Sequence, residues 1–206
     1  LGLGILALLP GVSASESPES ALKGLRKHYQ ALKTLNAEFR EVFEWAMTGE
    51  TVEQKGSFVI AGDDRFRFDT PEQLLVSDGT AVYRWNRSKQ QTIIESVAAS
   101  GNKMLPRKFM VEFGDDFRPV SVSDLTVDNA PGYRLDLEPF HPEEALLSKI
   151  TLWVTRSDNL VRRLKLVDLS QNATTYYLTE IKLNEAVFDS LFVFSPPPGV
   201  EIFDLR

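Results

Sequence analysis

Alternation of apolar and polar residues runs through most of this chain and is clearest over residues 56–86. Large apolar side chains stand two positions apart there, in three pairs: Phe58 and Ile60, Phe66 and Phe68, and Tyr83 and Trp85. A period of two is typical of strands with one apolar and one polar face. Turn-forming residues such as Gly62 and Gly79 separate the pairs. The segment therefore predicts hairpin-linked strands that place these aromatic side chains on one face.

The spacing of apolar residues changes to that of a helix in two places. Ser17 and Pro18 suit the N-cap and first position of a helix that continues to about Leu35. The apolar face of this helix consists of Leu22, Leu25, Tyr29 and Leu32. A second helical pattern, between residues 104 and 113, consists of Leu105, Phe109, Met110 and Phe113. We expect both helices to lie on an apolar surface.

Period-two patterns predict further strands, over Ala37–Met47, Gln91–Glu95, Val120–Val127, Tyr133–Glu138, Ser148–Thr155, Leu160–Leu169, Thr174–Leu183 and Phe192–Phe194. Glu41 is the exception among the apolar positions of the first of these, and Glu185–Ser190 is expected to form a short helical turn. Strands at hairpin spacing favour an antiparallel sheet. The predicted fold is α+β, mainly β: an incomplete, unclosed antiparallel barrel of about ten to eleven strands with an α-helical lid.

A sheet of this width can enclose a cavity that its own side chains do not fill. The candidate lining residues are aromatic: Phe39, Phe43, Trp45, Phe58, Phe66, Phe68, Tyr83 and Trp85. Phenylalanine and methionine make soft, undirected contacts that suit flexible apolar ligands. The same residues also suit a filled barrel core, and composition alone does not decide between these two interpretations.

Composition narrows the possible chemistry. The 206 residues carry a net charge of −6 and include no cysteine. The charge disfavours nucleic acid as a partner, and the lack of cysteine excludes disulfides, thiolate catalysis and a lipid-modified N-terminal cysteine. Neither His28 nor His141 stands in a metal-ligand or triad pattern. We therefore expect a binding protein and not an enzyme, with no catalytic residues, metal or cofactor.

The first residues have the features of an export signal. A short apolar run ends near Pro10, and Val12 and Ala14 have the spacing of small residues before a cleavage site. The alternative is a short buried helix or strand of the fold. We interpret residues 1–14 as the remnant of a secretory signal cleaved near Ala14, which predicts a single soluble, exported domain over residues 15–206.

Several short blocks follow one another along the chain: RFRF at 65–68 after Gly56, LVSDG at 75–79, VYRWN at 82–86, AVFD at 186–189 and FVFSPPPGV at 192–200. Together these blocks resemble the LolA-type outer-membrane lipoprotein carrier proteins of Gram-negative bacteria. Their order and spacing agree from the first helix to the end of the chain. The resemblance therefore covers essentially the whole mature sequence.

The resemblance implies a monomeric periplasmic carrier. Such a carrier accepts acylated lipoproteins from an inner-membrane ABC transporter, shields their acyl chains in a hydrophobic cavity, and passes them to an outer-membrane acceptor. That acceptor shares the fold but is itself a lipoprotein, so a chain without cysteine fits the carrier. The two predicted helices form the lid in this interpretation.

One position departs from the family pattern. The carriers often have an arginine, tied to lid opening and cargo retention, at the position that corresponds to Gly62. Arg65 and Arg67 are the nearest basic residues, so these two and Gly62 are the candidates for gating the lid. A lipid- or lipoprotein-sensing regulatory domain of the same fold is the alternative function, whereas a periplasmic hydrolase has no recognisable site.

Overall fold

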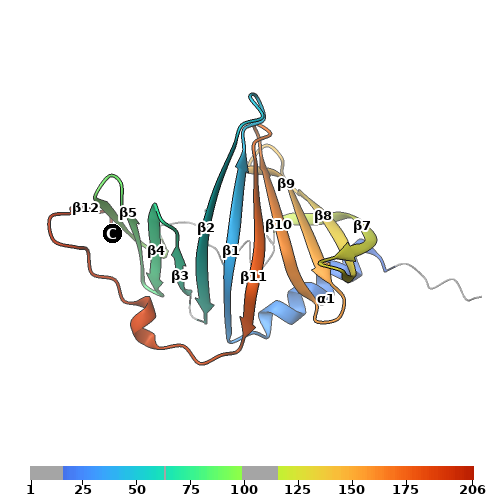
Figure 1. Ribbon diagram of the computed structural model, residues 1–206, viewed down its shortest axis with the longest axis horizontal. Coiled ribbons are helices and arrows are strands. Elements are labelled where there is room, and N and C mark those ends of the chain that lie inside the picture. The colour runs from blue at the N-terminus through green and yellow to red at the C-terminus, as the bar shows by residue number, and fades with distance from the viewer. Residues whose placement is uncertain (1–15, 63, 99–115) are drawn as a thin grey trace, which may run out of the picture.

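The computed structural model describes residues 16–62, 64–98 and 116–206. These residues form one α-helix, one short 3-10 helix and twelve strands, and all the strands belong to one open sheet (Figure 1). The elements are α1 Pro18–Gln30, β1 Thr34–Glu44, β2 Thr51–Ala61, β3 Arg65–Asp69, β4 Gln73–Asp78, β5 Ala81–Asn86, β6 Gln91–Ser96, β7 Phe117–Val127, β8 Ala130–Pro139, β9 Leu147–Thr155, β10 Leu160–Asp168, β11 Ala173–Leu183, the 3-10 helix η1 Asp189–Phe192 and β12 Glu201–Asp204. The predicted signal remnant and the predicted second helix lie outside the described residues.

The sheet has the order β12-β6-β5-β4-β3-β2-β1-β11-β10-β9-β8-β7. Neighbouring strands are antiparallel, except that β12 runs parallel to β6. The first and last strands of this order do not pair, so the barrel is unclosed, as predicted. Strands from the two ends of the chain meet at the centre, where Phe39 of β1 pairs with Leu178 of β11.

Helix α1 covers part of the concave face of the sheet. The hydroxyl of Ser17 caps its first turn by accepting a hydrogen bond from the Ser20 N–H at 3.2 Å. The helix contacts β7 and β8 and lies behind the strands in Figure 1. It ends well before Leu35, contrary to the prediction, because Leu35 already pairs with Ile60 in the sheet. Among the described residues no helix has the length and apolarity needed to cross a membrane.

The opposite, convex face of the central strands is polar. A cross-strand row of alternating arginines and aromatic rings follows the register there, in the order Arg40, Tyr177, Arg163, Trp153 and Arg134. Each guanidinium lies between 4.1 and 5.9 Å from the centroid of a neighbouring ring. The extended apolar surface of the central strands is therefore the concave one.

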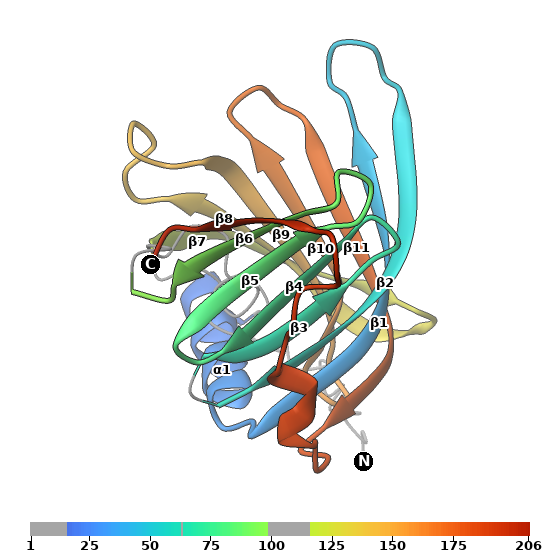
Figure 2. The same ribbon diagram turned by 90° about the vertical axis from the view of Figure 1, so that its left-hand side faces the viewer.

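The segment after β11 crosses the convex face of β3–β5 and brings β12 beside β6 (Figure 2). Phe192 is 1% exposed, and the Phe194 ring lies 5.8 Å from that of Tyr83 and 6.1 Å from that of Trp85. The predicted strand at Phe192–Phe194 was therefore wrong, whereas the short helical turn predicted at Glu185–Ser190 occurs a few residues later, as η1 Asp189–Phe192. These aromatic residues cover a sheet face instead of pairing along an edge, and the true last strand, β12, was not predicted.

Candidate functional site

An aromatic wall lies on the concave face where β1, β2, β3 and β11 meet. The Phe39 ring stacks on that of Phe68, with centroids 4.7 Å apart and planes at 22°, and lies 6.3 Å from the Phe58 ring. Tyr176 meets Phe39 edge-on at 5.6 Å. Phe58 and Phe68 are direct cross-strand partners, so they share one face of the sheet. We call Phe39, Phe58, Phe68 and Tyr176 the aromatic wall.

Gly56 makes this arrangement possible. It pairs with Phe39 across β1 and β2, and the Phe39 ring lies over it. A Cβ atom at this position would lie 2.4 Å from Phe39 Cζ and 2.4 Å from the Asp69 backbone oxygen. Only a residue without a side chain therefore lets Phe39 reach across β2 to Phe68.

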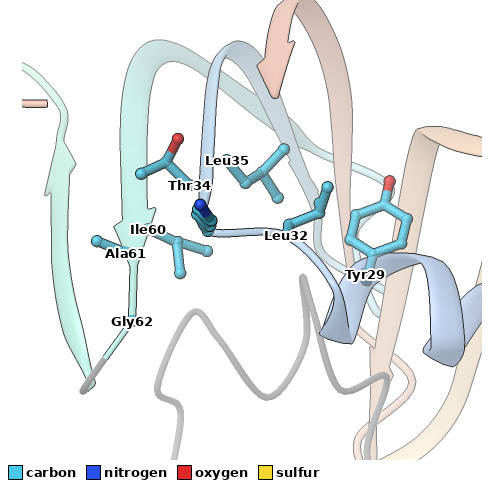
Figure 3. A pocket seen from close by; sticks show the side chains of 8 residues that line it. Tyr29, Leu32, Thr34, Leu35, Ile60, Ala61 and Gly62 are labelled. Carbon is cyan, nitrogen blue, oxygen red and sulfur yellow. The ribbon is translucent and has the colours of Figure 1, made fainter. Parts of the chain in front are cut away.

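A small recess with a cavity volume of about 20 Å³ lies between the end of α1 and the strands β1 and β2 (Figure 3). Its lining residues are Tyr29, Leu32, Lys33, Thr34, Leu35, Ile60, Ala61 and Gly62. Ile60 stands two positions from Phe58, so the recess and the aromatic wall occupy the same face of β2. A volume of this size holds about one water molecule, so a long ligand that enters the recess must lie mainly on the wall.

The predicted lid residues of α1 belong to the core. Leu22, Leu25 and Tyr29 are buried, and the partly buried Leu32 lines the recess. Lifting α1 would therefore expose a large apolar surface to water. The other predicted lid residues, Leu105, Phe109, Met110 and Phe113, lie outside the described residues.

A polar row borders the aromatic wall. Glu41 of β1 pairs with Gln54 of β2 and with Tyr176 of β11, which places all three side chains on the concave face. Gln54 Nε2 donates a hydrogen bond to Glu41 Oε2 at 2.9 Å. Burial raises the pKa of Glu41. The hydrogen bond from Gln54 lowers this pKa in part, and the nearby charge of Glu72 raises it further. Burial also raises the pKa of Tyr176. This face thus carries one carboxyl group at the border of an apolar surface.

The remaining predicted cavity residues of the first strands fall at the two ends of this face. Phe66 is buried beside Ile60, its cross-strand partner. Phe43 and Trp45 meet edge-on at 4.7 Å near the β1–β2 turn, where Trp45 is 47% exposed. Phe66 therefore packs next to the wall, whereas Phe43 and Trp45 lie beyond the polar row.

Tyr83 and Trp85 do not share the face of the aromatic wall, which corrects the sequence prediction. Phe68 pairs with Leu75, and Leu75 pairs with Arg84, so Arg84 and not its neighbours is on the concave face. Tyr83 and Trp85 instead face the C-terminal segment and contact Phe194. They are buried in part by that segment and not by the core beneath α1.

The three gating candidates also separate. Gly62 lines the recess, and its carbonyl accepts a hydrogen bond from Arg65 Nε at 3.3 Å. Arg65 forms an ion pair with Asp189 at 2.7 Å, and Arg67 donates to the Leu191 carbonyl at 3.4 Å. Both arginines thus hold the C-terminal segment on the convex face, while Gly62 alone borders the recess.

Two residues of the site were missed in the sequence. Tyr176 lies in a predicted strand with Thr174 and Leu178 on the same face, so the alternation of this strand already indicates where its side chain lies. Gln54 lies just before the alternating segment 56–86, and no apolar pattern indicates which way its side chain faces. Over the described part of the chain, no three His, Cys, Asp or Glu side chains come together in a group that suits a metal ion.

Comparison with known proteins gives consistent matches. The family described as "Outer membrane lipoprotein carrier protein LolA" matches residues 30–195. An outer-membrane lipoprotein carrier protein of Alcanivorax borkumensis is 25% identical over 96% of this chain and 94% of its own length. A protein of the same name from Pseudomonas fluorescens is 27% identical over 82% of each chain. An uncharacterized protein of Methanocaldococcus jannaschii is 23% identical over 93% of this chain, which spans only 55% of that relative.

Solved structures share the fold at low sequence identity. An uncharacterized conserved protein from Thermus thermophilus superposes with a TM-score of 0.58 and 11% identity, over 90% of this chain and 98% of the other. The lipoprotein LppX of Mycobacterium tuberculosis superposes with a TM-score of 0.50 and 9% identity, over 82% of this chain and 98% of the other. At these identities the similarity concerns the open, curved sheet alone.

Proposed function

The chain belongs to the LolA family of outer membrane lipoprotein carrier proteins, and we propose that it carries acylated lipoproteins by holding their acyl chains on the concave face of its sheet. The observation that carries this proposal is the aromatic wall, which continues on the same face of β2 into an open recess. Stacked phenylalanine rings offer an acyl chain broad apolar contact without a fixed shape.

The energetics of such a carrier require a competitor for the apolar surface. Burying an acyl chain releases about 0.8 kcal/mol per methylene group, so several long chains in an open, rigid pocket would not leave again. In this chain the end of α1 borders the recess, and its own apolar residues belong to the same core as the wall. Cargo and α1 side chains therefore compete for one surface, which keeps net binding reversible.

The proposed route follows from the family. We propose that the chain acts in the periplasm after loss of residues 1–14, that an inner-membrane ABC transporter supplies the acylated lipoprotein, and that an outer-membrane acceptor receives it. Two relatives are named outer-membrane lipoprotein carrier proteins, which supports lipoproteins as the cargo. Catalysis has no part in the proposal, since the transfer only moves a bound chain from one apolar surface to another.

A single charge on the wall tests the proposal. Phe68 is only partly buried, so Phe68→Glu places a carboxylate among the rings with limited damage to the core. Phe188→Glu is the matched control, because that ring is 80% exposed. The measurement is extraction of a triacylated peptide from vesicles into a soluble complex with the protein. We expect extraction by the control variant and none by Phe68→Glu, and equal extraction by both would contradict the proposal.

A further inference from the structure

The polar row next to the aromatic wall carries a second inference, which rests on the proposed function. We propose that Glu41 and Gln54 form the head-group subsite of the acyl-binding face, and that this subsite selects acyl chains whose head group offers an N–H donor and carries no negative charge. An N-acyl amide is the chemical class that meets both conditions.

The orientation of the Gln54 amide determines the first condition. A carboxylate only accepts hydrogen bonds, so the amide NH₂ must face Glu41, and Nε2 donates to Oε2 at 2.9 Å. The same orientation leaves Gln54 Oε1 as a buried acceptor without a hydrogen-bond partner among the described residues. A buried acceptor without a hydrogen bond costs free energy, and a ligand that donates a hydrogen bond to it removes this cost. An amide N–H supplies that donor, whereas an ester does not.

The carboxyl group of Glu41 determines the second condition. It lies on the concave face between Gln54 and Tyr176, and within the described residues no lysine or arginine forms an ion pair with it. A second carboxylate brought next to it would place two like charges in a poorly solvated position. The polar row therefore lowers the affinity of the face for free fatty acids, which have the same chain but an anionic head group.

The dimensions of the face agree with this assignment. Glu41 and Leu35 lie on the same face of β1, six residues apart, which corresponds to about 20 Å along a strand. Phe39 lies between them, and Leu35 lines the recess. Phe39 and Phe58 are 2% and 1% exposed, so the side chains that cover these rings must move aside when a ligand binds. The chain of a ligand with its head at the polar row would then cross the aromatic wall to the recess, a path of the length of an extended long acyl chain.

Three ligands with the same chain separate the two conditions. N-methyldodecanamide has a neutral head with a donor, methyl dodecanoate has a neutral head without one, and dodecanoate is anionic at neutral pH. Each is used to displace the neutral fluorescent probe N-phenyl-1-naphthylamine from the complete protein. We expect the amide to bind about tenfold more tightly than the ester, and the ester to bind more tightly than the anion.

Two variants assign each preference to its residue. Gln54→Leu is expected to abolish the advantage of the amide over the ester. Glu41→Gln is expected to bring the affinity for dodecanoate to within about twofold of that for the ester. Glu38→Gln is the matched control, because Glu38 is on the same strand and exposed on the opposite face. It removes the same charge, and all three affinities are expected to stay as in the unaltered protein.

The outcomes separate this inference from the proposed function. If none of the three ligands displaces the probe, acyl binding itself is refuted and the inference falls with it. Displacement by all three with equal affinity, unchanged in both variants, would overturn the inference and leave the acyl-binding proposal standing. A change that also occurs in Glu38→Gln would mean that net charge and not the subsite sets the preference, which equally overturns the inference.

Discussion

The hydroxyl of Tyr29 accepts a hydrogen bond from the backbone N–H of Val161, with a nitrogen–oxygen distance of 2.9 Å, and both residues are buried. The bond joins the last turn of α1 to β10 at the point where the register of β10 and β9 shifts. Since an irregular strand leaves backbone groups without ladder partners, the tyrosine satisfies one of them. The helix is thus fastened to the sheet at the end that borders the recess.

Tyr29→Phe removes this acceptor and keeps the ring. The Val161 N–H then remains buried without this partner, and we expect the free energy of unfolding to fall by about 1–3 kcal/mol. Urea denaturation measures this change. If α1 is part of the cover over the acyl site, exchange of bound acyl ligand becomes faster in the same variant. Unchanged stability and unchanged exchange would show that the bond contributes nothing to either.

Gly56→Ala is expected to distort the aromatic wall. Its new methyl group would overlap both the Phe39 ring and the Asp69 carbonyl, and because the second is backbone the strand must shift. We expect a loss of about 1–3 kcal/mol in stability and weaker acyl binding. Gly24→Ala is the control. That glycine is exposed on α1 with no atom near its missing Cβ, so the substitution should stabilise the protein by up to about 1 kcal/mol.

Asp136 is expected to make stability depend on pH in the acid range. Burial by itself raises the pKa of Asp136, but hydrogen bonds from Thr151, Arg134, Ser121 and Lys149 outweigh it and the pKa lies below its usual value. A carboxyl group with a lowered pKa in the folded state stabilises the fold above its unfolded pKa of about 3.9. This contribution is lost as the pH falls through the folded value.

Asp136→Asn tests that sign. The variant should be less stable than the unaltered protein at pH 7, and the difference should shrink as the pH falls below about 4. Urea denaturation at several pH values between 7 and 3 measures it. If the free energies of unfolding of the two proteins differ by the same amount at every pH down to 3, Asp136 does not contribute to the loss of stability in acid.

The C-terminal segment is expected to protect the convex face of β3–β5. Phe192 is buried there, and Arg65 lies over its ring at 5.2 Å while pairing with Asp189. Phe192→Ala should therefore release the segment and speed amide hydrogen exchange in β4 and β5, with a stability loss of about 3–5 kcal/mol if the whole domain responds. Phe188→Ala, at an exposed ring of the same segment, should change neither. Equal exchange in both variants would contradict this role.

The alternation of residues predicted most strands and the faces within each of them. Glu41 was expected among the apolar positions of its strand, and the structure places it on the concave face. A period of two does not say which of the two sets of side chains faces inward from one strand to the next. The prediction of the inward face was wrong for β5. In the neighbouring strand β4 the consecutive residues Leu74, Leu75 and Val76 are all buried, so both faces of β4 are apolar and its sequence does not show which face points inward.

The other error has a related physical cause. A run such as Phe192–Phe194 indicates an apolar segment that must be covered, but three residues are too few to show whether they pair along an edge or lie over a face. Pro196–Pro198 follow this run and have no backbone N–H to donate to a neighbouring strand. The chain therefore leaves the sheet here and returns to it only at β12, which pairs with β6. Polar members of the site such as Gln54 have no pattern of their own and become visible only through the register.

Photo-crosslinking locates a bound acyl chain on the protein and so tests whether it lies on the aromatic wall. A triacylated peptide with a diazirine near the end of one acyl chain is bound to the protein, irradiated and digested, and the labelled peptides are identified by mass spectrometry. We expect labels in β1, β2, β3 and β11, around Phe39, Phe58, Phe68 and Tyr176. Labels confined to the convex face, around Trp85 and Phe194, would contradict it.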